Sequence, residues 1–261
     1  MKKNDVCFTH FAAAIRRLDL DRVARPADIP KVFDLGREGR LSSHYIPFDY
    51  LNPAARLVLV GITPGFTQWK NAMRAAQRQL AAGEPARANL EDVKRAGAFS
   101  GPLRPNLIAL LDCIGLNRWL GLASCDVLFG AASHLVQTGS ILHHPIFIDG
   151  RNYNGTPSML RSPFLRGRIE TYFAAEAAAL SSAVFVPLGP RVGEGVLWLA
   201  REGVIPRDHV LAGLPHPSGA NIERVAYFLG RKARDTLSNK TNPVVLDAAR
   251  AALQAQVASL G

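Results

Sequence analysis

The sequence predicts an α/β protein, a three-layer α/β/α sandwich with a central four-stranded, mostly parallel sheet. Apolar runs of strand length recur near residues 57, 127, 184 and 210. Segments with helical apolar spacing separate these runs, as in βαβ units. The runs near 57 and 210 end in loops rich in Gly and Pro, which is typical of the carboxyl edge of a sheet, where α/β proteins bind ligands.

Length and composition favour one domain with a full hydrophobic core. The chain has 261 residues, of which 48% are hydrophobic, and this is enough for one large α/β domain. We expect a single domain over 1–261. Its parts would be an N-terminal helix and irregular segment at 1–54, a motif-bearing core at about 55–237, and a C-terminal helix at 242–260.

The composition also predicts a cytoplasmic protein without cofactor or metal. Cys7, Cys113 and Cys125 are widely spaced, which favours neither a disulfide framework nor a zinc or iron–sulfur site. No run approaches about 18 apolar residues, so we expect no membrane-spanning helix. His134, His143, His144 and Asp149 could form a metal set, but their spacing matches no metal motif.

The first half of the chain alternates helical and extended segments. Phe11, Ile15 and Leu18 recur at helical spacing, which predicts a helix over 5–19. Four prolines and two glycines make 26–54 look irregular. The next expected elements are a strand at 57–60, a helix from Trp69 that Gly83 stops, a surface helix through Arg95, a helix carrying Leu107, Leu110, Leu111 and Ile114, and a strand at 126–131.

The second half begins with a long segment, residues 133–163, that lacks sustained periodicity. Loops longer than about 15 residues are uncommon and usually functional or disordered, so we expect a substrate-facing flap here. The elements expected after it are a helix carrying Leu165, Ile169, Tyr172, Phe173 and Leu180, a strand at 183–189, a helix at 191–202, a strand at 209–214, a helix with Ile222, Val225, Phe228 and Leu229 on its inner face, and a terminal helix with Leu246, Ala249, Leu253 and Val257.

The charge balance indicates a polyanionic partner. The chain has 31 Lys and Arg against 21 Asp and Glu, a net charge of +10, and only seven of the basic residues are Lys. Guanidinium groups bind phosphate as forks, which makes a nucleic acid a reasonable partner. Alternatively, the arginines reflect a GC-rich genome and a solvated surface. Candidate phosphate contacts are Arg151, Arg161, Arg166, Arg168, Arg231, Lys232 and Arg234.

Two short motifs, each after an expected strand, carry a family resemblance. They are Gly61-Ile62-Thr63-Pro64-Gly65 and His216-Pro217-Ser218-Gly219-Ala220-Asn221. In this order they resemble the first and second motifs of the uracil-DNA glycosylase superfamily. Phe99-Ser100-Gly101 and Val186-Pro187-Leu188-Gly189 fall where that superfamily has similar pieces. The resemblance covers about residues 55–237.

The resemblance implies a monofunctional DNA glycosylase, for base excision in DNA repair or in antiviral defence against modified phage DNA. Such an enzyme flips a nucleotide out of the duplex and hydrolyses its N-glycosidic bond. His216 would donate to the base carbonyl as the bond breaks, although a structural histidine capping a turn is the alternative. The amides of Gly65, Ser218, Gly219 and Asn221, with Arg231 and Lys232, would contact DNA phosphates.

The resemblance also implies a base pocket. Phe66 would be its aromatic floor, with Gly61 and Ile62 beside it and Trp69 and Phe99 behind it. Ordinary core packing is the alternative for each of these aromatic residues.

Two departures from the family pattern bear on the chemistry. Thr63 stands where the superfamily often has Asp or Asn; its hydroxyl can hold a water but cannot take a proton from it at neutral pH. The strand predicted at 126–131 lacks the Asn that reads uracil, which leaves Ser133 or His134 as candidates for its place. We therefore expect a substrate other than plain uracil, such as a larger modified pyrimidine.

Two alternatives to a DNA glycosylase remain. One is a non-catalytic, nucleic-acid-binding member of the superfamily that has lost its water activator. The other is a nucleoside or nucleotide N-glycosidase that uses the same pocket on free substrate. No Lys lies in either motif, so a Schiff-base lyase step is not expected. The sequence gives no sign of an obligate protein partner.

Overall fold

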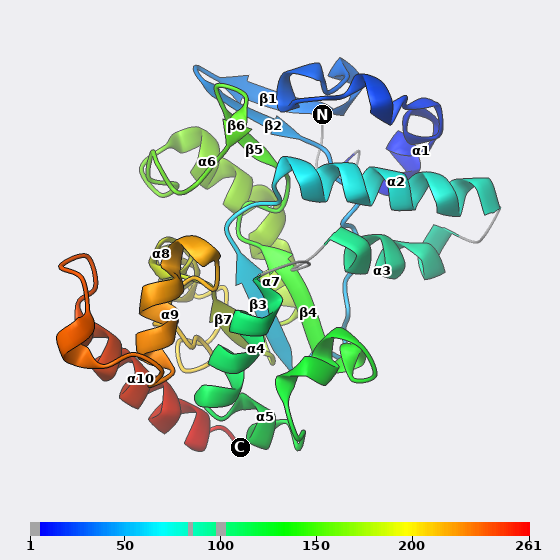
Figure 1. The fold of residues 1–261 in the computed structure, drawn as a ribbon. Helices are drawn as coiled ribbons and strands as arrows, with labels where there is room; N and C mark the ends of the chain where they lie inside the picture. Colours follow the sequence, from blue (N-terminus) through cyan, green and yellow to red (C-terminus); the bar gives the residue numbers. More distant parts are fainter. Residues whose placement is uncertain (1–5, 83–85, 98–102) are drawn as a thin grey trace. The chain divides into compact units, whose positions relative to one another are not determined.

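The computed structural model describes residues 6–82, 86–97 and 103–261, which form parts of two compact units (Figure 1). The first unit consists of Met1–Leu51, Ile62–Ala98 and Gly139–Glu176. The second consists of Asn52–Gly61, Phe99–Thr138 and Ala177–Gly261. Each unit is therefore assembled from three separate segments of the chain. The single domain over 1–261 stays a prediction.

The first unit contains an antiparallel sheet that the sequence did not reveal. Its strands are β1 (Asp34–Glu38), β2 (Leu41–His44), β5 (Ile146–Ile148) and β6 (Arg151–Asn152), in the order β1-β2-β5-β6 (Figure 1). The predictions of an irregular 26–54 and of a long loop over 133–163 were therefore wrong. The strands have two to five residues and mixed polarity, too short for a period of two to stand out.

The first unit combines several helices with an aromatic core. They are α1 (Phe8–Arg17), α2 (Phe66–Ala82), α3 (Ala86–Gly97) and α6 (Pro163–Arg168), and α6 continues through a π-helical segment (Ile169–Phe173) into α7 (Ala174–Ala179). Short 3₁₀ turns lie at Leu20–Arg22, Pro26–Asp28 and Lys31–Phe33. The helices predicted from the spacing around Phe11 and Trp69 are confirmed. The predicted stop signal Gly83 lies outside the described residues. The buried aromatic side chains include Phe11, Phe33, Tyr45, Trp69 and Phe147.

The parallel sheet confirms the α/β class. It consists of β3 (Leu57–Gly61), β4 (Val136–Ser140) and β7 (Val184–Pro187), in the order β4-β3-β7. β3 and β7 pair in parallel, and both are buried along their whole length. The fourth strand predicted at 209–214 is reduced to one parallel bridge between Phe185 and Val210. Among the described residues this sheet therefore has three strands, not four.

The strand predicted at 126–131 was also wrong, because capping groups turn the backbone there. Ser124 accepts a hydrogen bond from the amide of Asp126, and the Asp112 carboxylate accepts one from the Cys125 amide at 2.7 Å. These bonds begin a 3₁₀ turn over Cys125–Phe129. A second 3₁₀ turn, Ser133–Leu135, leads into β4, which lies next to β3 in the sheet.

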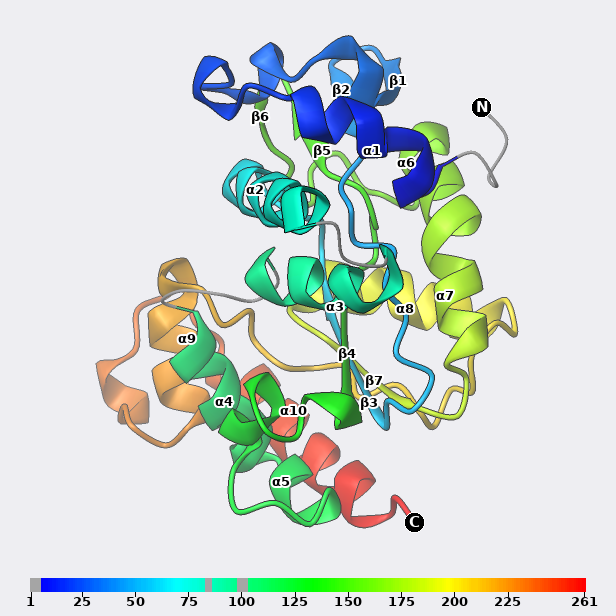
Figure 2. The same ribbon diagram turned by 90° about the vertical axis from the view of Figure 1, so that its right-hand side faces the viewer.

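Helices of the second unit pack on the parallel sheet (Figure 2). They are α4 (Arg104–Cys113), α5 (Leu116–Trp119), α8 (Pro190–Arg201), α9 (Ile222–Phe228) and α10 (Pro243–Ala258), with 3₁₀ turns at Gly219–Asn221 and Arg234–Thr236. Leu57 and Leu59 of β3 share one core with side chains of α4, α9 and α10. The predicted inner face of α9 was wrong at Ile222, which is 55% exposed. Within the described ranges, no helix is long and apolar enough to cross a membrane.

Candidate functional site

The second motif forms a loop whose backbone is fixed on both sides. Asn106 of α4 donates from Nδ2 to the Pro217 carbonyl at 3.0 Å. Within the loop, the Asn221 amide donates to the Ser218 carbonyl at 2.9 Å, and Asn221 Nδ2 lies 3.2 Å from Ser218 Oγ. The loop begins at His216, so these bonds restrict where its imidazole can lie.

The loop also sets the protonation of His216. The Ser218 amide donates to His216 Nδ1 at 3.2 Å, so Nδ1 is an acceptor and carries no proton. Burial lowers the pKa of His216 below its usual value, which favours the neutral ring at pH 7. The one proton of the neutral ring then lies on Nε2. His216 is therefore arranged as a neutral hydrogen-bond donor.

His216 lies at the carboxyl edge of the parallel sheet. Gly189 lies two residues after the end of β7 and has φ 91° and ψ 163°. A Cβ atom placed on Gly189 would lie only 3.1 Å from the Cβ of His216. The neighbouring Leu188 amide donates to the carbonyl of Val60, near the end of β3, at 2.9 Å. His216 thus adjoins the ends of two parallel strands, where ligands of α/β proteins bind.

His216 lines a pocket of about 480 Å³ in the second unit. This volume lies within the about 300–1,000 Å³ of small-molecule sites. Arg224, which lines it too, donates to Asn221 Oδ1 at 2.7 Å and to the Lys240 carbonyl at 2.8 Å. The other lining residues include Pro190, Pro215, Lys240, Asn242 and Leu246. The pocket therefore combines a neutral imidazole donor with two cationic side chains.

Thr63 of the first motif, in the first unit, binds the backbone of a neighbouring segment. Its hydroxyl donates to the His144 carbonyl at 3.1 Å and accepts from the Ile146 amide at 3.0 Å. A hydroxyl has one proton and two lone pairs. The hydroxyl proton of Thr63 is therefore used in the bond to His144, and one lone pair of its oxygen remains to accept a hydrogen bond from a water. Its predicted role in orienting water stays a prediction.

Side chains occupy two backbone amides at the end of the first motif, and of these the Gly65 amide was predicted to contact phosphate. The Gly65 amide donates to Gln68 Oε1 at 2.8 Å, and the Phe66 amide donates to Asn152 Oδ1 at 3.0 Å. A phosphate at this turn would have to displace both side-chain oxygens.

Of the aromatic residues predicted for the base pocket, Phe66 is half-buried and Trp69 belongs to the core. Phe66 is half-buried and stacks on Trp69 with a centroid distance of 6.2 Å. Trp69 is fully buried and donates from its indole to the Tyr45 carbonyl at 2.8 Å, so it is a core residue and not a wall of the pocket. Phe99, with the rest of Phe99-Ser100-Gly101, lies outside the described residues.

The predicted base-reading residues divide between the two ends of the sheet. Gly61 ends β3, and the carbonyl of the adjacent Ile62 accepts from the Leu142 amide at 3.0 Å. Ser133 and His134 precede β4 instead of following a strand, so they lie at the amino edge, opposite to the edge that carries His216. Their expected place after a strand was wrong, because it depended on the strand predicted at 126–131, and their role as base readers stays a prediction.

The predicted phosphate-binding side chains lie on the surface, and several have ionic partners. Lys232 pairs with Glu223 at 3.2 Å. Glu223 also accepts from Ser238 and Thr241, and these hydrogen bonds lower its pKa to about 2. Arg166 pairs with Glu170 at 3.5 Å. Arg151, Arg161, Arg231 and Arg234 are exposed, and Arg168 donates to the Leu35 carbonyl at 2.6 Å.

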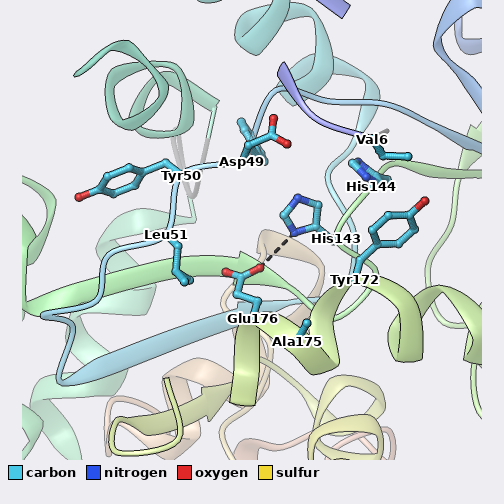
Figure 3. Close-up of a pocket in the computed structure, with 10 residues that line it drawn as sticks. Val6, Asp49, Tyr50, Leu51, His143, His144, Tyr172, Ala175 and Glu176 are labelled. Atoms are coloured by element: carbon cyan, nitrogen blue, oxygen red, sulfur yellow. Dashed lines mark hydrogen bonds and ion pairs between the residues drawn. The ribbon is translucent and has the colours of Figure 1, made fainter. Parts of the chain in front are cut away.

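A second pocket, in the first unit, contains a polar cluster that sequence reasoning did not find (Figure 3). His143 Nδ1 lies 3.1 Å from Glu176 Oε2. The other oxygen of Glu176 lies 3.6 Å from Lys94 Nζ, and both of these charged side chains are more than nine-tenths buried. Across the pocket, the Asp49 carboxylate accepts from the Tyr45 hydroxyl at 2.6 Å. The pocket therefore has a carboxylate on each side of the His143 ring.

Burial sets the ionisation of this cluster. It raises the pKa of Asp49 and lowers the pKa of Lys94, although the nearby carboxylates of Glu176 and Asp49 oppose the effect on Lys94. It also lowers the pKa of His144 well below the usual value. His144 is 3% exposed, and its Nδ1 has no hydrogen-bond partner.

The only sequence signal for this pocket was the His143-His144 pair inside a His-rich segment. Lys94 lies in a helix whose polar composition suggested a surface position, and Asp49 lies in a segment expected to be irregular. The chain segments that meet here are distant in the sequence, as Lys94 and Glu176 are 82 residues apart, and no local pattern reveals such a contact. In the described part of the chain, no group of three or more His, Cys, Asp or Glu side chains is arranged to hold a metal ion.

Comparison with known proteins gives one informative relative. The chain is 34% identical over 232 residues to the uncharacterized protein YoxB of Bacillus subtilis (strain 168). The match covers 88% of this chain and 90% of that protein. No protein-family model matches the chain, and no solved structure matches it significantly.

Proposed function

This chain belongs to the same family as Bacillus subtilis YoxB, and we propose that it is a monofunctional DNA glycosylase. The proposed reaction is hydrolysis of the N-glycosidic bond of a flipped, uracil-like base, with a modified pyrimidine favoured over plain uracil. The name of the relative assigns no activity, so the proposal depends on the residues of this chain. The proposal includes the fold: a three-layer α/β/α sandwich like that of the uracil-DNA glycosylase superfamily.

The observation that carries the proposal is the state of His216. Cleavage of the bond between base and sugar leaves its electron pair on the departing base, so negative charge develops on a base carbonyl. A neutral imidazole with its proton on Nε2 can donate to that oxygen. One preorganised donor of this kind is worth about 10²–10³ in rate. The position of His216 beside Gly189 at the carboxyl edge of the sheet supports this role.

The order of the parallel strands adds support. In order of appearance along the chain, β4-β3-β7 is second-first-third, and Val210 bridges to β7 on the side where a fourth strand would lie. Doubly wound sheets of this order bind their ligands at the carboxyl ends of the first and third strands. Here these are β3, which runs into the first motif, and β7, which runs into Gly189.

The base reader is better sought at the carboxyl end of β4 than at Ser133 and His134. This end contains Thr138, Gly139 and Ser140, and none of them offers the amide side chain with which the superfamily pairs uracil. A site without such groups discriminates weakly against altered bases. This supports a bulkier, modified pyrimidine as the substrate.

Water activation is the weak part of the proposed mechanism. Thr63 has one lone pair left to hold a water and cannot accept a proton from it at neutral pH. Loss of general-base assistance costs about 10²–10⁴-fold, which a dissociative reaction can tolerate. The committed hydroxyl also favours the second candidate, a DNA-binding member of the superfamily without activity.

The experiment is mass-spectrometric detection of free base released from labelled DNA. The substrates are oligonucleotides with uracil, DNA from phages with hypermodified pyrimidines, and the matching free nucleosides. We expect release from DNA by the wild type, a loss of about 10²–10³-fold in His216→Ala, and little change in His134→Ala. The His134 variant is the matched control, because its side chain is exposed at the amino edge.

Each result separates the candidate functions. DNA binding without base release by wild type and by His216→Ala would indicate the non-catalytic member. Release from nucleosides alone would indicate a nucleoside N-glycosidase. Rapid release of uracil with none of a bulky base would exclude the modified-pyrimidine substrate.

A further inference from the structure

The pocket around His143 is a candidate binding site that the proposed glycosylase reaction does not use. Its volume is about 270 Å³, and its lining contains no residue of either motif. It lies entirely within the first unit. Phe48, His144 and Tyr172 are aromatic residues that line it. The pocket is thus a small cleft with aromatic walls and a polar centre.

The fixed charges around this pocket leave a negative balance. Lys94 lies 3.6 Å from Glu176, both are more than nine-tenths buried, and Lys94 also attracts Asp49, so one fixed cation serves two carboxylates. Asp49, on the opposite wall, has the Tyr45 hydroxyl as a donor, and this group is neutral. Burial of two carboxylates that share one counter-charge is unfavourable. A single positive charge in the pocket would compensate Asp49.

His143 supplies a second acceptor that faces the same space. Because the Glu176 carboxylate can only accept, His143 Nδ1 carries the proton of the 3.1 Å hydrogen bond between them. In the neutral ring, Nε2 is therefore an acceptor. Figure 3 shows the ring extending from Glu176 toward Asp49. A ligand between Asp49 and His143 would meet acceptors and would need several N–H donors.

The helix that forms one wall has an irregularity that places its side chains in the pocket. Tyr172 belongs to the π-helical segment Ile169–Phe173, and Glu176 follows in α7. Such segments are rare and occur frequently at functional sites. The rings of Tyr172 and His144 meet edge to face at 4.6 Å. Aromatic faces beside a carboxylate are suited to an organic cation.

We propose that this pocket binds a small organic cation of the guanidinium type. Its N–H groups would donate to the Asp49 carboxylate and to His143 Nε2, and its planar face would lie against the aromatic wall. Lys94 and Glu176 act as positioning residues, because they fix the His143 tautomer. This site is independent of the glycosylase proposal, and either can fail without the other.

The test is an NMR titration of the full chain with methylguanidinium, followed through the ring signals of His143 and His144. N-methylurea, with the same shape but no charge, is the matched probe. We expect saturable binding of methylguanidinium and binding of N-methylurea that is at least 10-fold weaker. Asp49→Asn should weaken methylguanidinium by about 10- to 100-fold, as expected for a lost charged hydrogen bond.

Glu170→Gln is the control variant, since it removes one negative charge from the same helix at an exposed position. Its affinity for methylguanidinium should equal that of the wild type. The comparison of the two probes on wild-type protein requires no variant and decides the matter even if Asp49→Asn does not fold. Equal binding of the two probes, or no saturable shift by methylguanidinium, would overturn the proposal.

Discussion

Gly189→Ala tests whether close packing against β7 positions His216. Gly189 has φ 91° and ψ 163°, a conformation that is essentially restricted to glycine and costs other residues about 1–3 kcal/mol. The added methyl group would also lie 3.1 Å from the Cβ of His216, so the imidazole must move by a few tenths of an ångström. Displacements of about 1 Å at a catalytic group can cost 10²-fold, and we expect about a 10-fold loss of base release.

Two measurements check this prediction. In a chain of this size, each kcal/mol of lost stability lowers the melting temperature by about 2–4 °C. A cost of about 1–3 kcal/mol should therefore lower it by about 2–12 °C. The ¹⁵N shifts of the His216 ring should change, since the Ser218 hydrogen bond depends on its position. Gly203→Ala is the control, because Gly203 also has positive φ, 74°, but no atom lies within 4 Å of the added Cβ. Unchanged His216 shifts and full activity in Gly189→Ala would refute the reasoning.

Further predictions concern the first unit. Thr63→Val should lower the free energy of unfolding by about 1–3 kcal/mol through two lost hydrogen bonds, and Thr63→Ser should restore it; equal melting temperatures would contradict this. Burial lowers the pKa of His44 to about 4. As the pH falls, His44 is therefore protonated in the unfolded chain before it is protonated in the folded chain. Stability should therefore be full above pH 6.5 and fall by up to about 3 kcal/mol toward pH 4, and a His44→Gln variant without a flatter pH profile would disprove the assignment. Lys94→Met should destabilise by about 3–5 kcal/mol, and adding Glu176→Gln should recover part of this loss in thermal melts.

The elements predicted correctly from the sequence are those with a strong local pattern. β3 and β7 are runs of buried aliphatic residues, and α2 and α8 have one apolar face. The elements that were missed depend on distant partners or on side-chain caps. Strands β1 and β2 have no pattern of their own and exist because β5 and β6 complete their sheet.

The candidate site was predicted unevenly for the same reason. The loop carrying His216 could be found because Gly and Pro mark it, and its place after a strand-like run was visible in the sequence. The error at 126–131 placed Ser133 and His134 after a strand, whereas they precede β4 at the amino edge of the sheet. The pair of Lys94 and Glu176 could not be predicted, because only the folded chain brings these charges together.

The antiparallel sheet of the first unit also constrains how the chain folds during synthesis. β2 pairs with β5, so residues 41–43 find their partners only at 146–148. Until about 100 further residues have left the ribosome, β2 is an edge with unpaired backbone groups. Such distant pairing slows folding and exposes strands to other chains. We expect fragments that end before β5 to aggregate and to require chaperone protection in the cell.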